Sequence, residues 1–433
     1  MNGFSPLNPS DHVLLIMDRE IRKAGLPGAW CAFALELDGA PDASRLEAAL
    51  SAAAATFPVL SARLTRHGRI YGWQPTGKAI PLYRRSRPGH LSSEAFWQEN
   101  YLELMQGAPD AFAGPPLSFH LLEGEDRTLA LVRWLHPLMD AGGVKRLFDF
   151  LVATPAQRQQ FLRGEGSLVD AKLRSWPWKR RLALLWRGKR HNARIDHLES
   201  SQPTHLCQAT QYSLETCHLL LSREETSQVL QNLRRRVGLG GQSLYFIACL
   251  MRALEAMGAE MEKDAWCIPY AFDLRPGNAP GPVTGNQVSV LFAQAPREVV
   301  RQRGPLFEHL RRQHADTLRH ELDMAYLPLM WLGRWLSLDR YASILRLQKT
   351  GGERSSAWFS DIGEVRFATE DFFGATIRGI RHGCFVTAPP SLAVLFSRFQ
   401  GRLTVSINSL RPALPQDRIE HFRALLTREL LAE

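Results

Sequence analysis

The stretch from Thr128 to Gly143 constrains the fold of this chain more than any other. It reads Thr-Leu-Ala-Leu-Val-Arg-Trp-Leu-His-Pro-Leu-Met-Asp-Ala-Gly-Gly. An apolar, strand-like run leads straight into His136, and Asp140 follows four residues later beside two glycines. This spacing places an imidazole at the end of a buried strand, with a carboxylate near enough to brace the turn. The pattern indicates a general-base site.

The bulk composition is that of a folded protein with more than one domain. The chain has 433 residues, of which 45% are hydrophobic and 22% charged, so we expect two or three domains. Its six cysteines form no CxxC pair, which favours free thiols in a reducing cytosol. We find no signal peptide at the start and no apolar run near the roughly 20 residues of a membrane span. The sequence therefore predicts a cytoplasmic protein.

Strand and helix patterns mix throughout the chain, which predicts an α/β fold with two similar halves, each a mixed sheet with flanking helices. We expect an N-terminal half at 1–165, a basic connector at 166–210 and a C-terminal half at 211–433. Strands are predicted at 30–38, 116–122 and 128–136, and a hairpin at 391–408. Helices are predicted to begin at the capping residues Ser44 and Ser222.

The connector concentrates much of the formal net charge of +10. Nine basic residues and no acidic one fall between 171 and 194, with tryptophans among them. Pro177 suits the start of a helix and Gly188 its end. On this helix Trp178, Leu182, Leu185 and Trp186 share a stripe, with Arg180 and Arg187 opposite. We predict that Trp178, Arg180, Trp186 and Arg187 are interfacial.

Several partners fit the predicted basic helix. An anionic membrane surface, an acidic carrier protein and the phosphates of CoA suit it equally, and so does a helix packed on the body with a solvated basic face. No recognition fold accompanies the charge, so we do not expect nucleic acid. His191, His197, His205 and Cys207 are too irregularly spaced for a zinc site, and we expect no metal.

Further short motifs accompany the stretch 128–143, beginning with residues 4–11 and 57–60. Together these motifs resemble the CoA-dependent acyltransferase superfamily. This superfamily includes chloramphenicol acetyltransferase, the condensation domains of nonribosomal peptide synthetases and the bacterial wax ester synthase/diacylglycerol acyltransferases. Its HHxxxDG motif stands here as Leu135-His-Pro-Leu-Met-Asp-Ala-Gly142. The other segments follow in the family's order over nearly the whole chain, at residues 4–11, 57–60, 272–276, 285–286 and 359–363. The resemblance implies two chloramphenicol acetyltransferase-like halves around an interdomain channel, and His136 as the general base.

The chain departs from the family pattern at three places. Leu135 replaces the first histidine, and Ala141 replaces the usual glycine, with Gly142 next in line. Ser61 stands where condensation domains often carry an arginine that pairs with the motif aspartate, so Arg63 and Arg275 become the candidate partners of Asp140.

The resemblance also suggests the residues around the substrate. It points to Asn286 and Ser360 as oxyanion donors. Gly142 and Gly143 would let the backbone approach the reacting centre closely. We expect Asp140 to fix the loop rather than to relay charge.

The sequence thus predicts an acyltransferase that needs no bound cofactor. It would move an acyl group, which could be fatty, from acyl-CoA or a phosphopantetheinyl carrier protein to an alcohol or amine. Ester formation on a lipid-like acceptor is preferred, which allows peripheral attachment to the inner membrane face. Condensation-type amide formation and a non-catalytic binding member of the same fold are the alternatives.

Overall fold

The computed structural model describes residues 3–86, 94–162, 165–204, 212–238, 241–275, 281–349 and 352–433. The chain divides into two compact units, and both are discontinuous in sequence. The first unit comprises residues 1–175, 273–288 and 364–385, and the second comprises 176–272, 289–363 and 386–433.

This division differs from the one expected from the sequence. The predicted C-terminal half, 211–433, contributes two segments to the first unit, and the predicted connector, 166–210, is split near residue 175. One reason is that β13 (Ala375–Gly383) pairs antiparallel with β2 (Trp30–Asp38), with His382 opposite Phe33. A strand pair so distant along the chain leaves no local signal. Residues 205–210 of the predicted connector lie outside the described residues.

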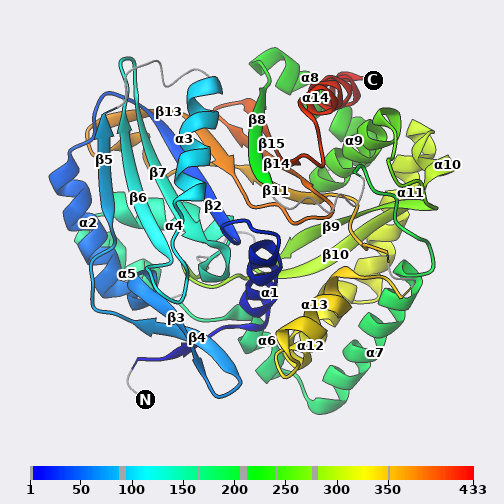
Figure 1. The fold of residues 1–433 in the computed structure, drawn as a ribbon, viewed down its shortest axis with the longest axis horizontal. Coiled ribbons are helices and arrows are strands. Elements are labelled where there is room, and N and C mark those ends of the chain that lie inside the picture. The colour runs from blue at the N-terminus through cyan, green and yellow to red at the C-terminus, as the bar shows by residue number, and fades with distance from the viewer. Residues whose placement is uncertain are drawn as a thin grey trace. The chain divides into compact units, whose positions relative to one another are not determined.

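The first unit is built on a six-stranded sheet in the order β12-β13-β2-β7-β6-β5 (Figure 1). The described pairs are antiparallel except β5 with β6, which are parallel, so the sheet is mixed. Its remaining strands are β5 (Leu82–Ser86), β6 (Leu117–Glu123), β7 (Thr128–Leu135) and β12 (Asp371–Phe372). A three-stranded sheet, in the order β1-β4-β3, is formed by β1 (Ser5–Pro6), β3 (Ala62–His67) and β4 (Ile70–Pro75).

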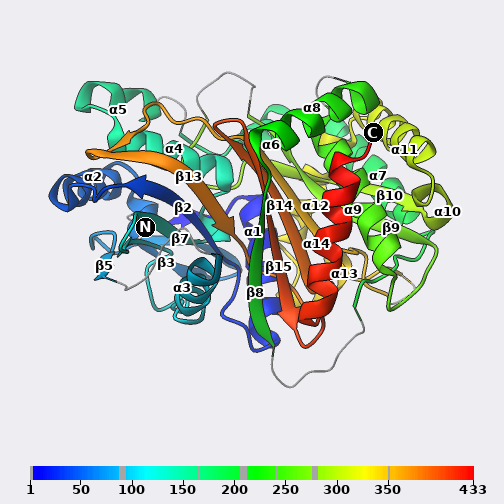
Figure 2. The same ribbon diagram turned by 90° about the horizontal axis from the view of Figure 1, so that it is seen from above.

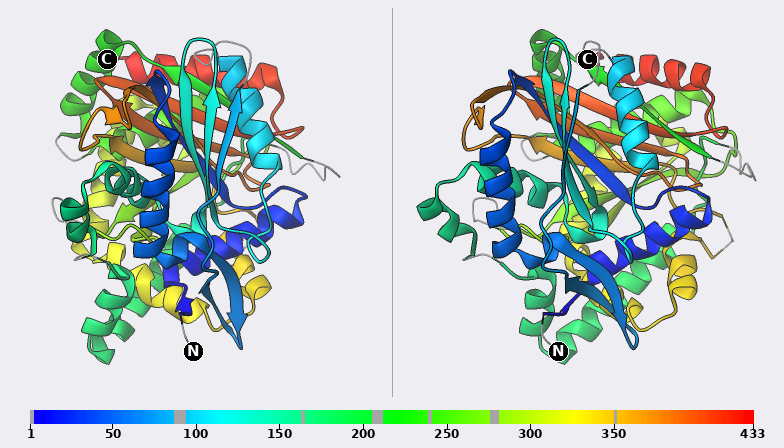
Figure 3. Two further views of the ribbon diagram at one scale, coloured as in Figure 1. Left: turned by 90° about the vertical axis from the view of Figure 1, so that its left-hand side faces the viewer. Right: turned by 60° about the vertical axis from the view of Figure 1, so that its left-hand side comes forward.

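Helices cover both faces of the six-stranded sheet. On one face the ring of Phe148, from α4, meets Phe33 and Phe119. On the other face α3 packs close, so that a Cβ on Gly383 would lie 2.5 Å from the Tyr101 ring. Figure 3 shows α3 beside this sheet in two views. The helices of the unit are α1 (Pro9–Lys23), α2 (Ala43–Thr56), α3 (Glu94–Gln106), α4 (Ala141–Val152), α5 (Pro155–Leu162) and α6 (Leu168–Ser175), with 3₁₀ turns η1 (Pro58–Ser61) and η2 (His136–Leu138).

Burial on both faces explains why β7 reads as a continuous apolar run. All eight of its residues are buried, as expected for a strand covered by helices on each side. The predicted cap of α2 was wrong by two residues. Asp42, not Ser44, is the N-cap, and its side chain accepts from the Arg45 nitrogen at 3.1 Å.

The second unit contains a four-stranded sheet, β11-β14-β15-β8, and a two-stranded sheet, β10-β9. Its core includes Phe246 of α9 stacked on Phe396 of β14 at 4.4 Å between ring centres, and Figure 2 shows α14 alongside α9. The strands are β8 (Ser213–Leu220), β9 (Ala265–Asp273), β10 (Val288–Pro296), β11 (Trp358–Glu364), β14 (Leu392–Phe399) and β15 (Arg402–Arg411). The helices are α7 (Trp178–Ile195), α8 (Arg223–Val237), α9 (Gln242–Met257), α10 (Arg297–Val300), α11 (Arg303–Arg319), α12 (Leu322–Gly333), α13 (Leu338–Arg346) and α14 (Gln416–Leu431).

The predicted α/β class is confirmed, and the predicted hairpin is present as β14 and β15. The basic helix, however, does not end at Gly188. It runs on to Ile195 because α7 packs tightly on α12, and a Cβ at position 188 would lie 2.6 Å from Leu329 and 3.0 Å from the Ala325 carbonyl oxygen. Gly188 is therefore a packing residue. Among the described residues, no single helix is long and apolar enough to cross a membrane, and one pair, α8 with α9, passes that test only as a helix bent by 100°.

Candidate active site

His136 stands at the point where β7 ends and the η2 turn begins. Its backbone nitrogen donates to the Ala29 carbonyl at 2.9 Å, which extends the pairing of β7 with β2 to this position. Pro137 then starts η2 and ends the strand. The imidazole is half-buried and meets the edge of Phe385, with 5.7 Å between ring centres. His136 thus lies directly after the end of a buried strand, as the sequence predicted, in the first position of a short 3₁₀ turn.

Burial lowers the pKa of His136 from its ordinary 6.5. Its own backbone carbonyl, the charge of Asp140 and the side chain of Asn286 act in the opposite direction and offset part of this effect. The ring nitrogen Nδ1 is buried and has no hydrogen-bond partner within the described part of the chain. The lowered pKa favours the neutral imidazole at pH 7, which is the state that can accept a proton.

Asp140 is fully engaged in holding the loop. As the N-cap of α4, its Oδ1 accepts from the Gly143 nitrogen at 2.8 Å. Its two oxygens accept from both terminal nitrogens of Arg275, at 2.8 and 3.0 Å, and Oδ2 also accepts from the Gln287 nitrogen at 2.9 Å. Four hydrogen bonds occupy the carboxylate. Asp140 therefore joins the His136 loop to Arg275 and Gln287.

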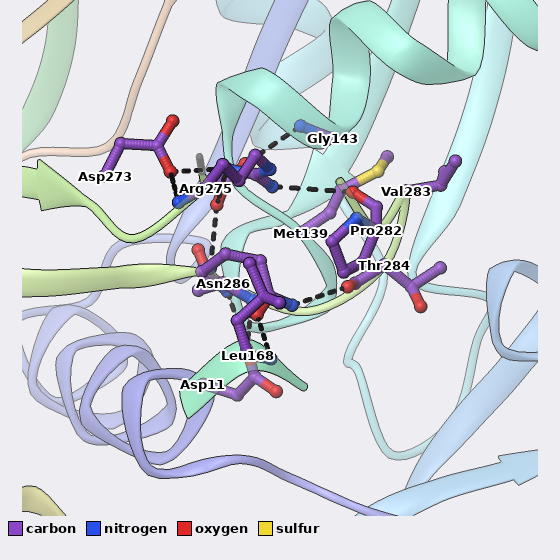
Figure 4. A network of polar contacts seen from close by, with 12 residues as sticks. Asp11, Met139, Gly143, Leu168, Asp273, Arg275, Pro282, Val283, Thr284 and Asn286 are labelled. Carbon is purple, nitrogen blue, oxygen red and sulfur yellow. Dashed lines mark hydrogen bonds and ion pairs between the residues drawn. The ribbon is translucent and has the colours of Figure 1, made fainter. Parts of the chain in front are cut away.

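Of the two arginines considered as partners of Asp140, Arg275 is the one that pairs with it. The pair is bidentate and its side chains are only 10% and 9% exposed. Figure 4 shows Arg275 reaching Asp273 as well, and the backbone of Pro282. Arg63 lies exposed on β3, in register with Gln74.

Gly142 and Gly143 allow close packing at this junction, and their predicted place beside a substrate stays a prediction. A Cβ on Gly143 would lie 2.2 Å from the Val283 carbonyl oxygen, and one on Gly142 would lie 3.0 Å from Arg275 Nη1. The groups that approach these glycines closely are the Val283 carbonyl and the Arg275 guanidinium of the same unit. A backbone hydrogen bond from Gly285 to Leu138, 2.7 Å long, completes the contact.

Asn286 does not have the predicted geometry of an oxyanion donor. Its Nδ2 donates to Asp11 Oδ1 at 2.9 Å and to the His136 carbonyl at 2.8 Å. Because both amide hydrogens are taken, neither remains for a substrate oxygen. Asn286 instead fixes the backbone of His136, and the residue is fully buried.

Asp11 belongs to the site, although sequence reasoning did not select it. Its Oδ1 accepts from the backbone nitrogen of Asn286 at 2.7 Å (Figure 4). Its Oδ2 accepts from the backbone nitrogen of Asn8 at 3.0 Å. Burial raises the pKa of Asp11 to about 7, and the charge of Asp140 acts in the same direction. The hydrogen bonds from Asn286 and Asn8 oppose this shift. The available signal was the capping box at the start of α1, Asn8-Pro-Ser-Asp11.

The other predicted site residues lie in the second unit. Ser360 is on β11 and is half-buried, and its role stays a prediction. Trp178 and Trp186 are exposed on α7, whereas Arg180 and Arg187 both contact Glu321 through their guanidinium groups. Across the described residues, no group of three His, Cys, Asp or Glu side chains could hold a metal ion.

The fold is that of acyl-transferring and condensing domains. The first condensation domain of the CDA synthetase matches with a TM-score of 0.71 and 16% identity, over 100% of this chain and 97% of that one. Trichothecene 15-O-acetyltransferase from Fusarium sporotrichioides matches with a TM-score of 0.70 and 13% identity, over 99% and 94%. A mutant starter condensation domain of rhizomide synthetase, in complex with C8-CoA, matches with a TM-score of 0.68 and 13% identity. The match covers 100% of this chain and 95% of that one.

These matches show that the chain shares its fold with condensation domains and with an O-acetyltransferase, as the predicted resemblance implied. In sequence, no protein-family model and no curated protein matches the chain.

Proposed function

We propose that this protein is an acyltransferase that moves an acyl group from a thioester to an alcohol or amine, with His136 as the general base. The observation that carries the proposal is the neutral, half-buried imidazole at the end of β7, on a loop held by Asp140, Arg275, Asn286 and Asp11. The match over the full chain to condensation domains and to an O-acetyltransferase supports the same class.

The reaction needs one proton acceptor and no covalent enzyme intermediate. Because Nδ1 is buried, we assign the base to Nε2. Nε2 takes the proton of the acceptor hydroxyl or amine as its oxygen or nitrogen attacks the thioester carbonyl. When the tetrahedral intermediate collapses, the carbon–sulfur bond breaks and the imidazolium returns the proton to the departing thiolate. The charge of Asp140 stabilises the imidazolium between the two steps.

We further propose acyl-CoA or a phosphopantetheinyl carrier as co-substrate, with no bound cofactor, in a cytoplasmic protein. The rhizomide synthetase domain was solved with C8-CoA, which supports the CoA option. A lipid-like alcohol is the preferred acceptor, supported by the exposed tryptophans of α7. Amide formation is the second candidate, because condensation domains recur among the structures with this fold.

The test is a mass-spectrometric screen of acyl-CoA donors against pooled alcohols and amines, followed by thiol-release kinetics. We expect His136→Ala to lower transfer about 10²- to 10⁴-fold, the usual contribution of a general base. With the wild type, kcat/KM should fall only as the pH drops below 6.5, because the base must be neutral and burial lowers its pKa. His421→Ala, an exposed change on α14, is the control.

Two results would contradict the proposal. Unchanged transfer in a folded His136→Ala protein would remove this residue from the mechanism. No thiol release with any donor, together with saturable binding of an acyl-CoA, would instead indicate a non-catalytic binding member of the same fold.

A further inference from the structure

The helix α7 carries two of the most exposed tryptophans in the described chain. Trp178, Leu182 and Trp186 are 66%, 46% and 61% exposed. They stand four residues apart, and since each step of four turns a helix by only about 40°, they form one stripe along its length. Single exposed apolar side chains are common on protein surfaces, but several large ones in a row indicate an interaction surface.

The stripe lies on the far side of α7 from its packed face. Leu184, Gly188, His191 and Ile195 are the buried residues of the helix. Contacts to α12 fix this face, through Gly188 against Leu329 and through the Tyr326 hydroxyl, which donates to Asn192 at 2.8 Å. At about 100° per residue the two faces point roughly 150° apart. The same packing that buries one face therefore presents the other outward.

Two lysines supply positive charge directly beside the tryptophan rings of the stripe. Lys179 lies 6.0 Å from the centre of the Trp178 ring, and Lys189 lies 5.2 Å from that of Trp186. Both lysines are exposed, and α7 contains no acidic residue. Arg180 and Arg187 both contact Glu321 and lie on a different side of the helix from the stripe, so their interfacial role stays a prediction.

We propose that this face of α7 binds the surface of an anionic lipid bilayer. Trp178, Leu182 and Trp186 enter the headgroup region, where indole rings are favoured because they combine apolar area with one polar N–H. Lys179 and Lys189 reach lipid phosphates beside them. A tryptophan–lysine stripe without acidic residues complements a negatively charged layer along residues 178–189 of the helix. The proposal goes beyond acyl transfer and does not depend on it.

Vesicle flotation of the full-length protein tests this surface. Vesicles of phosphatidylglycerol and phosphatidylcholine should bind the wild type, and vesicles of phosphatidylcholine alone should bind it at least about 10-fold more weakly. The pairs Trp178→Ala/Trp186→Ala and Lys179→Glu/Lys189→Glu should each reduce binding about 10-fold or more. The matched controls are Trp335→Ala, which removes another exposed tryptophan, and Arg235→Glu/Arg423→Glu, which reverses two exposed charges on α8 and α14. The controls should bind like the wild type.

Three results would overturn the proposal. The first is absence of the wild type from anionic vesicles, and the second is an equal loss in the controls, which would mean attraction by net charge alone. The third is a dimer, seen by size-exclusion chromatography with light scattering, that Trp178→Ala/Trp186→Ala dissociates while vesicle binding stays absent. That outcome would assign the face to a second copy of the chain. Thiol release from soluble substrates, measured without vesicles, keeps failure here distinct from failure of the acyltransferase function.

Discussion

At the residue scale, the geometry of the His136 loop depends on the ion pair of Asp140 with Arg275. The two are 135 residues apart in sequence, and the pair is almost fully buried. A buried carboxylate that loses its partner keeps the cost of desolvation without the compensating attraction. The pair therefore matters for stability and for the placement of His136 together.

We predict that Arg275→Met lowers the free energy of unfolding by about 3–5 kcal/mol. Arg275→Lys should cost less, since it keeps the charge but loses the bidentate geometry. Adding Asp140→Asn to Arg275→Met should recover part of the loss, because no unpaired charge is then buried. Denaturant unfolding of the four proteins measures these differences. Equal losses for the lysine and methionine variants would contradict the prediction, because they would show that a positive charge without the bidentate contact contributes nothing.

Sequence reasoning found His136 and Asp140 because strand, histidine and aspartate follow one another within a few residues. It did not select Asp11, and it gave Asn286 the wrong task. Asp11 contacts Asn286 across 275 residues of sequence, and which acceptors occupy the amide hydrogens depends on tertiary packing. A pattern read along the chain can propose a donor, but it cannot tell whether that donor is already used.

At the element scale, the face of the six-stranded sheet that carries α3 contains buried polar side chains. His120 of β6 bonds to Ser118 at 3.0 Å, stacks on Tyr83 and is 3% exposed. Burial, assisted by the charges of Arg133 and Arg85, lowers the pKa of His120 to about 3. The neutral imidazole is thus built into the packing of this sheet.

This sheet should lose stability in acid through His120. Between pH 6.5 and about 3 the unfolded chain binds a proton that the folded chain does not, so stability falls as the pH falls. The slope for one proton is about 1.4 kcal/mol per pH unit. We expect His120→Gln to reduce the slope of the unfolding free energy against pH by up to that amount between pH 6 and 4.5.

Ser118→Ala is the matched control, because it removes the hydrogen-bond partner and leaves the titrating ring. It should lower stability at every pH with little change in slope. The pKa values of Asp11 and Glu353 are both raised to about 7, so these two groups make stability rise as the pH falls. Each variant is therefore compared with the wild type, in which these two groups make the same contribution. A His120→Gln slope equal to that of the wild type would mean that the ring is protonated in the folded state.

Elements with a local signal were predicted well. The capping box of Ser222 with Glu225 is present at α8, and the strand pair around residues 124–126 is β6 with β7. The basic helix was predicted too short because Gly188 normally favours a helix end, whereas here it allows contact with α12. Local propensity gave the element, and packing between elements decided its length.

At the scale of the whole molecule, the first unit is completed by segments from late in the chain. The segment 364–385 brings β13 to the edge of β2, and the segment 273–288 brings Arg275 and Asn286 to the His136 loop. An N-terminal half that ended at residue 165 or 175 would lack both. Without them β2 becomes an open sheet edge, and the Asp140 carboxylate loses its partner.

We therefore predict that residues 1–175 do not fold as an isolated fragment. The fragment should give a weak near-ultraviolet circular dichroism signal and no cooperative unfolding transition, although it contains most of the strands of its sheet. A chain that joins 1–175 to 273–288 and 364–385 through flexible Gly/Ser linkers should recover both properties, because it restores β13 and the pair of Arg275 with Asp140. The same chain carrying Arg275→Met should lose most of that recovery. If residues 1–175 alone unfold as cooperatively as the joined chain, the late segments do not complete the unit, and the boundary read from the sequence is the better description of the folding domain.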